Sequence, residues 1–173
     1  MKASLGNMYG ETQSVRIAGI PLFIVLPIIG ILVPLCISGP QILVGSLVNM
    51  LLVFYALRFP TKPYAIMCMM PSMGAIGNGL VLGTLTPFLI YFIPCIWIGN
   101  IVFVSTVQKL SHINIFLRVV LGAMLKSTIL FLMAYIFIRL QMVPQALLAP
   151  MGVAQLVTAL VGGFLAMNIY KRI

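Results

Sequence analysis

The sequence predicts an all-α polytopic membrane protein, a six-transmembrane-helix bundle with short loops. Of its 173 residues, 62% are hydrophobic and only 6% are charged, with a mean hydropathy of +1.22. A soluble domain carries about 25% charged residues. Apolar stretches near the length that crosses a bilayer recur along the chain, and basic residues gather in alternate loops. Together these observations indicate one compact bundle and no separate soluble domain.

Six apolar spans can be placed along the chain, and proline and glycine mark the first two. We predict six spans at residues 16–37, 41–57, 64–82, 87–107, 113–138 and 144–170. The first contains Pro21, Pro27 and Pro34 and is therefore expected to be kinked or broken. An uncharged turn at 38–40 separates it from the second span. Residues 1–15 are predicted to form a cytoplasmic tail, and 16–173 a single transmembrane domain.

The later spans end in loops of alternating charge. The second span ends at 58–63, which is basic and rich in proline, and the third at the uncharged segment 83–86. The fourth stops at 108–109, and a short link at 139–143 joins the fifth to the sixth. Because every connection is short, sequential spans are expected to be antiparallel neighbours.

The basic residues favour one orientation. Those expected on one side are Lys2, Arg16, Arg58, Lys62, Lys109, Arg118, Lys171 and Arg172. Of the three loops on the other side, two have no basic residue and one has Arg139. The positive-inside rule then places both termini in the cytoplasm of a multi-pass protein of the cell membrane. The net charge of +9 therefore reflects topology, and we expect no nucleic-acid partner.

The inventory of reactive side chains argues against an enzyme. The chain has one acidic residue, Glu11, and one histidine, His112, so it has no carboxylate pair for acid–base catalysis. Cys36, Cys68 and Cys95 lack the spacing of a metal site. We therefore expect no metal and no cofactor. The chain also lacks a P-loop, so it cannot power transport by nucleotide hydrolysis itself.

Lys126 is the one ionisable residue expected far from both membrane surfaces. About twelve residues separate it from either end of its span, or roughly 18 Å at the helical rise. That depth is too great for the ammonium to reach the headgroups easily. With no acidic partner in the membrane, Lys126 is expected to meet a carbonyl, an anion or water. A Ser–Lys catalytic dyad is the one enzymatic alternative left open for it.

Neutral polar side chains are expected between Lys126 and the outer surface. Such groups usually face the interior of a bundle, where they form either a binding site or interhelical hydrogen bonds. The predicted substrate-binding residues are Lys126, Asn49, Asn78, Gln155, Trp97, Gln41 and Arg139. A pocket with amides, an indole and one ammonium suits a small neutral or anionic molecule. A cation is disfavoured because no carboxylate is present to receive it.

Two stripes of small residues recur every four positions. They are Ala75, Gly79 and Gly83 in the third span, and Ala154, Thr158, Gly162 and Ala166 in the sixth. Small residues let helix backbones approach closely in lipid. The stripes pack either within this protein or against a partner membrane protein. The predicted partner-docking residues are Ala75, Gly79, Gly83, Thr158 and Gly162.

The sequence resembles a known family of transport proteins. The segments GPQILVGSLVNMLLV (39–53) and TPFLIYFIPCIWIGN (86–100) look like the second and fourth helices of substrate-binding (S) components of energy-coupling-factor (ECF) vitamin transporters. The resemblance covers residues 16–170. It implies capture of a vitamin or related metabolite from outside the cell, and docking to a transmembrane coupling subunit that carries two ATPases. The family's AxxxA-type docking motif is not found in the first span.

The leading hypothesis is therefore a substrate-binding membrane subunit for uptake of a small, vitamin-like metabolite. Its expected partners are the substrate, membrane lipid and the coupling subunit with its ATPases. Two alternatives stay open. One is a non-catalytic assembly or scaffold subunit of a membrane complex, and the other is a small channel or facilitator.

Overall fold

The structure, a computed structural model, describes residues 16–17 and 20–172. The predicted tail at 1–15 lies outside the described residues. The elements, in order, are β1 (Arg16–Ile17), β2 (Ile20–Pro21), α1 (Leu22–Cys36), α2 (Gln41–Arg58), α3 (Ala65–Asn78), η1 (Gly83–Phe88), α4 (Leu89–Lys109), α5 (Ile115–Arg139), η2 (Gln145–Leu147), α6 (Leu148–Met151) and α7 (Val153–Arg172). The described part of the chain is thus all-α apart from one pair of two-residue antiparallel strands.

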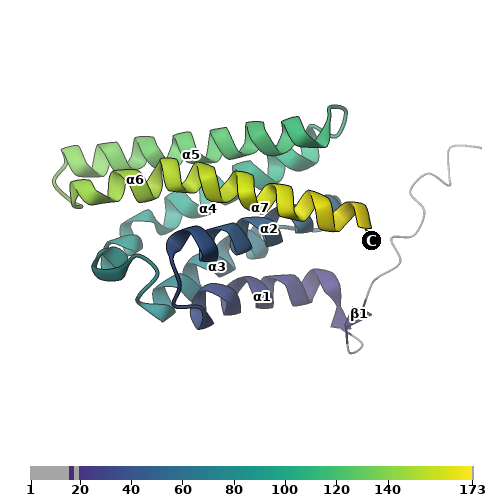
Figure 1. Cartoon of the computed structure of the whole chain (residues 1–173), viewed down its shortest axis with the longest axis horizontal. Coiled ribbons are helices and arrows are strands. Elements are labelled where there is room, and N and C mark those ends of the chain that lie inside the picture. The colour runs from purple at the N-terminus through teal and green to yellow at the C-terminus, as the bar shows by residue number, and fades with distance from the viewer. Residues whose placement is uncertain (1–15, 18–19, 173) are drawn as a thin grey trace, which may run out of the picture.

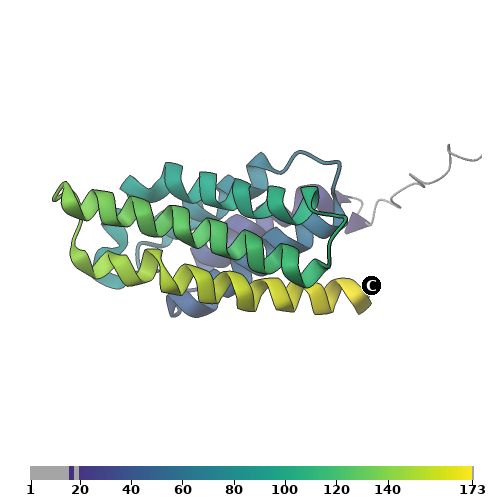
Figure 2. The same ribbon diagram turned by 90° about the horizontal axis from the view of Figure 1, so that it is seen from above.

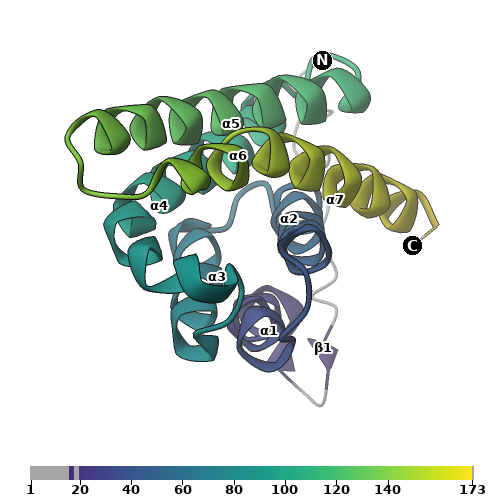
Figure 3. The same ribbon diagram turned by 60° about the vertical axis from the view of Figure 1, so that its left-hand side comes forward.

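In Figures 1 and 2 the long helices run along the length of the molecule and alternate in direction, and Figure 3 shows that α5 and α7 cross α1 and α2 at an angle. The C-terminus and β1 lie at the same end of the bundle in Figure 1. This end, here called the basic end, also receives the loops after α2 and α4. Its basic residues are Arg58, Lys62, Lys109, Arg118, Lys171 and Arg172. The opposite end, here called the neutral end, has Arg139 alone among the described lysines and arginines.

Four helical stretches are long and apolar enough to cross a membrane. They are Gln41–Arg58, Gly83–Lys109, Ile115–Arg139 and Gln145–Arg172, with 18, 27, 25 and 28 residues. By contrast α1 has 15 residues and α3 has 14. At the helical rise these two extend about 22 and 21 Å, against a hydrocarbon core of about 30 Å. The described residues therefore contain four helical stretches of crossing length where the sequence predicts six spans.

Local backbone chemistry explains why the first and third predicted spans are shorter than expected. Helix α1 begins only after Pro21, whose nitrogen has no hydrogen to donate. Helix α3 ends at Gly79, which has a left-handed φ of 74° that favours glycine. The predicted helix over 64–82 is therefore corrected to Ala65–Asn78, and the chain returns through the 3-10 helix η1.

Two hydrophobic clusters fill the bundle. The basic-end core takes side chains from all six long helices, and its largest fully buried members are Tyr55, Phe103, Leu52 and Met67. The neutral-end core is built around Leu89, Phe92, Leu130, Ala134, Leu147 and Met151. Buried residues of α1 and α2 belong to the first core and not to the second. The neutral-end core therefore contains no buried side chain from α1 or α2.

Glycines bring two pairs of helices into close contact. A Cβ atom on Gly162 of α7 would lie 2.3 Å from the carbonyl oxygen of Ser46 on α2. A Cβ atom on Gly74 of α3 would lie 2.1 Å from the carbonyl oxygen of Ile31 on α1. Both positions therefore require glycine, and they set the α2–α7 and α1–α3 spacings.

Candidate functional site

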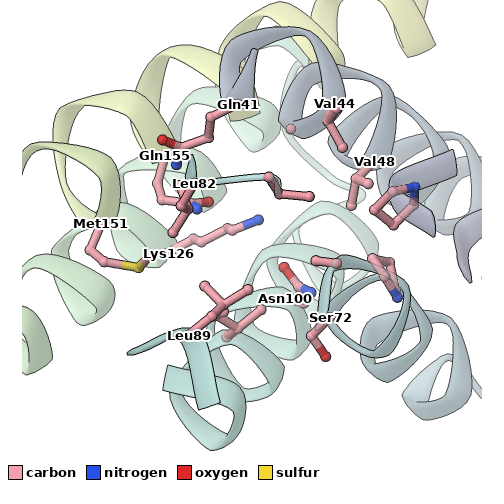
Figure 4. A pocket seen from close by; sticks show the side chains of 16 residues that line it. Gln41, Val44, Val48, Ser72, Leu82, Leu89, Asn100, Lys126, Met151 and Gln155 are labelled. Atoms are coloured by element: carbon pink, nitrogen blue, oxygen red, sulfur yellow. The ribbon is translucent and has the colours of Figure 1, made fainter. Parts of the chain in front are cut away.

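A cavity lies between the helices in the neutral half of the bundle (Figure 4). Figure 3 shows how the helices that contribute to its lining are arranged. Its volume is about 90 Å³. Its lining comes from α1, α2, α3, α4, α5, α6, α7 and the segment before η1: Pro34, Gln41, Val44, Gly45, Val48, Pro71, Ser72, Ala75, Val81, Leu82, Leu89, Ile96, Asn100, Lys126, Met151 and Gln155. The cavity thus extends from Gln41 and Leu82 near the neutral end to Lys126 and Asn100 at mid-bundle.

Lys126 places an ammonium at the inner end of this cavity. Only 3% of the residue is exposed, and its side chain reaches into the cavity in Figure 4. Its Nζ donates a hydrogen bond of 2.6 Å to Oδ1 of Asn49 and lies 5.6 Å from the centre of the Phe103 ring. Gly99 on α4 leaves room for its stem, because a Cβ there would lie 3.3 Å from Cγ of Lys126. A ring face and an amide oxygen both favour a cation.

A short hydrogen-bond chain holds Asn49 in place. The Nδ2 of Asn49 donates to Oγ1 of Thr158 at 3.2 Å, and that hydroxyl donates to the carbonyl of Gln155 at 3.2 Å. Because its amide nitrogen is engaged by Thr158, Asn49 turns its oxygen toward Lys126. Three helices, α2, α5 and α7, therefore cooperate to fix the ammonium.

Asn100 supplies a second polar group at the same depth. Its Nδ2 donates to the carbonyl of Cys68 at 2.8 Å. Its Oδ1 is buried without a hydrogen-bond partner among the described residues, and only 1% of Asn100 is exposed. In Figure 4 this amide oxygen points into the cavity on the side of Lys126. Lys126 therefore offers hydrogen-bond donors to the cavity, and Asn100 offers an acceptor.

Trp97 does not line the cavity but contacts a residue that does. Its indole nitrogen donates to Oγ of Ser72 at 2.7 Å, and that hydroxyl donates to the carbonyl of Met69 at 2.8 Å. Ser72 lines the cavity, whereas Trp97 does not. Both bonds of the Ser72 hydroxyl are thus made within the protein. The contact makes Trp97, the one tryptophan of the chain, an optical reporter of the cavity.

Gln41 and Gln155 line the cavity nearer its neutral end. The Nε2 of Gln41 donates to the carbonyl of Pro150 at 2.9 Å, which ties the start of α2 to α6. Gln155 is half-buried on α7, and Figure 4 shows its amide directed toward the cavity. Four of the seven predicted binding residues thus come together. Lys126, Gln41 and Gln155 line the cavity, and Asn49 contacts Lys126 from behind the lining.

Asn78 and Arg139 lie away from the cavity. Asn78 donates to the carbonyl of Leu35 at 2.9 Å and to Oγ of Ser38 at 3.1 Å. It therefore clamps the ends of α1 and α3 together. Arg139 is exposed in the last turn of α5. The structure brings neither residue to Lys126.

The predicted docking stripes mostly face inward or lie in turns. Thr158 is buried against Gly45, and Gly162 packs on the α2 backbone, so neither is on the surface for a partner to contact. Ala75 is buried and lines the cavity. Gly79 and Gly83 have positive φ values of 74° and 57° and form the turn after α3, because the helical repeat that would align them ends at Asn78.

Sequence reasoning did not single out Asn100 or Ser72 as site residues. The available signal for a site residue was that each is a polar residue within a largely apolar span. Which way each points depends on how its helix is rotated in the bundle. Among the described residues, no group of three His, Cys, Asp or Glu side chains could hold a metal ion.

A comparison of the chain with protein-family models, with curated proteins and with solved structures finds no match. The geometry of the site is therefore the basis for inferring the function of this chain.

Proposed function

We propose that this chain is the membrane-embedded substrate-binding subunit of an uptake system for a small neutral or anionic metabolite, of the kind that vitamin-binding ECF S components serve. A separate coupling subunit with ATPases energises it. Because no comparison matches, support for this proposal comes from the cavity and its polar groups.

The observation that carries the proposal is the setting of Lys126. An ammonium has three N–H donors, and the described residues give it one acceptor, Asn49. A buried charge in a membrane protein is costly and marks a functional site by default. Here the charge faces a cavity rather than lipid, beside the unpartnered oxygen of Asn100. Such convergent polar groups in an apolar pocket are typical of ligand sites.

The orientation in the membrane is part of the proposal. All six helical segments cross the bilayer, with both termini in the cytoplasm and the neutral end outside. Support comes from the basic residues, which gather at one end, and from the alternating helix directions. The shorter α1 and α3 are then completed by their flanking residues or by local thinning of the bilayer. The cavity reaches toward the external side.

The packing of the basic end favours binding over a channel. Tyr55, Phe103 and Val107 are each no more than 1% exposed there, and they close the bundle between the cavity and the proposed cytoplasmic side. The scaffold alternative relied on the small-residue stripes, and the Thr158–Gly162 stripe is used inside the chain. The substrate-binding hypothesis is therefore preferred to both alternatives.

The test begins with the native ligand. Mass spectrometry of small molecules released from gently purified protein identifies candidates, and titration followed by Trp97 fluorescence gives their affinity. We expect Lys126→Met to weaken binding at least about tenfold, which corresponds to about 1.4 kcal/mol. The control is Arg139→Met, which removes an exposed cation and leaves affinity unchanged. Equal affinities in the wild type and Lys126→Met would refute the proposal.

The partner is tested separately. Co-expression with a candidate coupling subunit and its ATPases is expected to give a complex that survives purification and supports ATP-dependent uptake in proteoliposomes. Uptake by the chain alone down a gradient would instead indicate a facilitator.

A further inference from the structure

Resting on the proposed function, we propose that the cavity at Lys126 selects a compact monovalent carboxylate or similar oxyanion that also carries its own O–H or N–H donor. The inference names the ligand class of that site. The inference depends on the charge of Lys126, on the unpartnered amide oxygen of Asn100 and on the volume of the cavity.

The charged form of Lys126 favours an anionic ligand. Lys126 is 3% exposed, and no described residue carries a carboxylate, since Glu11, the one acidic residue of the chain, lies outside the described residues. Asn49 and Phe103 stabilise the ammonium with an amide dipole and a ring face, but neither carries a compensating charge. In a poorly polar interior an opposite charge interacts strongly with the ammonium. Lys126 is the one cationic residue that lines the cavity, so a single negative charge completes the site.

The hydrogen-bonding groups require a donor on the ligand. Oδ1 of Asn100 is an acceptor without a described partner, and its own Nδ2 is held by Cys68. A carboxylate alone brings only acceptors, which suit Lys126 but leave this oxygen unsatisfied. A site built to hydrogen-bond a ligand group rejects analogues that lack it, because its own buried polar atom is then unpaired.

The size and walls of the cavity limit the rest of the ligand. Its volume of about 90 Å³ favours a compact ligand. Val44, Val48 and Leu89 supply apolar walls for a short hydrocarbon portion. A short-chain hydroxy acid has each of these features.

Three probes of equal size separate the requirements. Lactate carries both a carboxylate and a hydroxyl, 2-methylpropanoate replaces the hydroxyl by a methyl group, and lactamide replaces the carboxylate by a neutral amide. The full chain in nanodiscs is titrated with each, in a buffer whose other anion is a bulky sulfonate. Trp97 fluorescence and the unfolding temperature are followed. We expect lactate to bind at least about tenfold more tightly than either analogue.

Two variants assign the preferences to residues. Asn49→Asp places a carboxylate at the acceptor position of Lys126, where it neutralises the ammonium. The second oxygen of the carboxylate replaces the amide that donates to Thr158, and it can accept from the Thr158 hydroxyl if that hydroxyl turns away from Gln155. We expect this variant to remain folded and to bind lactate at least about tenfold more weakly than wild type. Asn100→Leu removes the acceptor, and we expect lactate and 2-methylpropanoate to bind it equally. Arg139→Met is the control and keeps the wild-type order.

Several outcomes would overturn the inference. They are lactamide binding as tightly as lactate, wild-type lactate affinity in folded Asn49→Asp, and no response to any of the three probes. If lactamide binding is tight and is lost in Lys126→Met, the anion inference fails while the substrate-binding function stands. If none of the probes binds, the function is decided independently by the released metabolites and the Lys126→Met titration described above.

Discussion

The two ends of the bundle are packed in different ways. At the basic end all six long helices contribute to one core, which includes Tyr55, Phe59 and Phe103. At the neutral end the core around Phe92 and Leu147 draws on α3 to α6 and leaves out α1 and α2. The cavity occupies the side that this second core does not fill. The difference teaches that the cavity lies between the neutral-end core, whose Leu89 and Met151 line it, and the α2 face that carries Val44, whereas one continuous core fills the basic end.

The largest expected effect tests the strength of the basic-end core. Phe103→Ala removes a fully buried ring, which we expect to lower the free energy of unfolding by about 3–5 kcal/mol. The matched variant at the neutral end is Phe92→Ala, also fully buried. Its loss should be smaller because η2 and α6 can relax into the space, and the cost of a cavity depends on such collapse. Denaturant unfolding in micelles measures both, and equal losses would contradict the comparison.

A second prediction concerns the polar layer between the two cores. Asn49→Leu removes the described acceptor of Lys126, which we expect to cost about 2 kcal/mol of unfolding free energy. Lys126→Met should cost less than Asn49→Leu, because it removes the buried charge and leaves unpaired only the neutral amide oxygen of Asn49. The double variant should therefore recover most of the loss caused by Asn49→Leu. Simple addition of the two single effects in the double variant would show that the pair is not coupled.

The smallest expected effect concerns the clamp between α1 and α3. Asn78→Ala removes hydrogen bonds to Leu35 and Ser38, and we expect it to cost about 1 kcal/mol. The control is Asn168→Ala, whose exposed amide donates only within its own helix to Phe164 and should change stability by less than about 0.5 kcal/mol. Thermal unfolding followed by circular dichroism measures both. A larger effect at Asn168 than at Asn78 would contradict the clamp.

Much of the fold follows from local signals in the sequence. The predicted second span, 41–57, differs from α2 by one residue, and the predicted fifth span, 113–138, differs from α5 by no more than two at each end. Apolar length, loop charge and proline are short-range features, so they can be read directly from the sequence. The early end of α3 was not predicted, because Gly79 fits a helical stripe as well as it fits a left-handed cap.

The site was predictable only where depth alone decides burial. Lys126 is far from both ends of α5, so its burial could be anticipated from position. The directions of Asn100 and Asn78 could not, because they depend on the rotation of each helix against its neighbours. Asn100 turns its oxygen into the cavity, whereas Asn78 is used to join two helix ends.

Gly152 separates α6 from α7. Its φ of −104° and ψ of −93° are not helical, and the backbone hydrogen bonds from Gly152 to Leu148 and from Leu156 to Gly152 continue across it. Breaking the Gln41–Pro150 hydrogen bond would release α6, while Thr158 on α7 would continue to hold Asn49. Under the proposed function, ligand entry toward Lys126 and the positioning of Lys126 would therefore involve different hydrogen bonds, and each can be altered by one substitution.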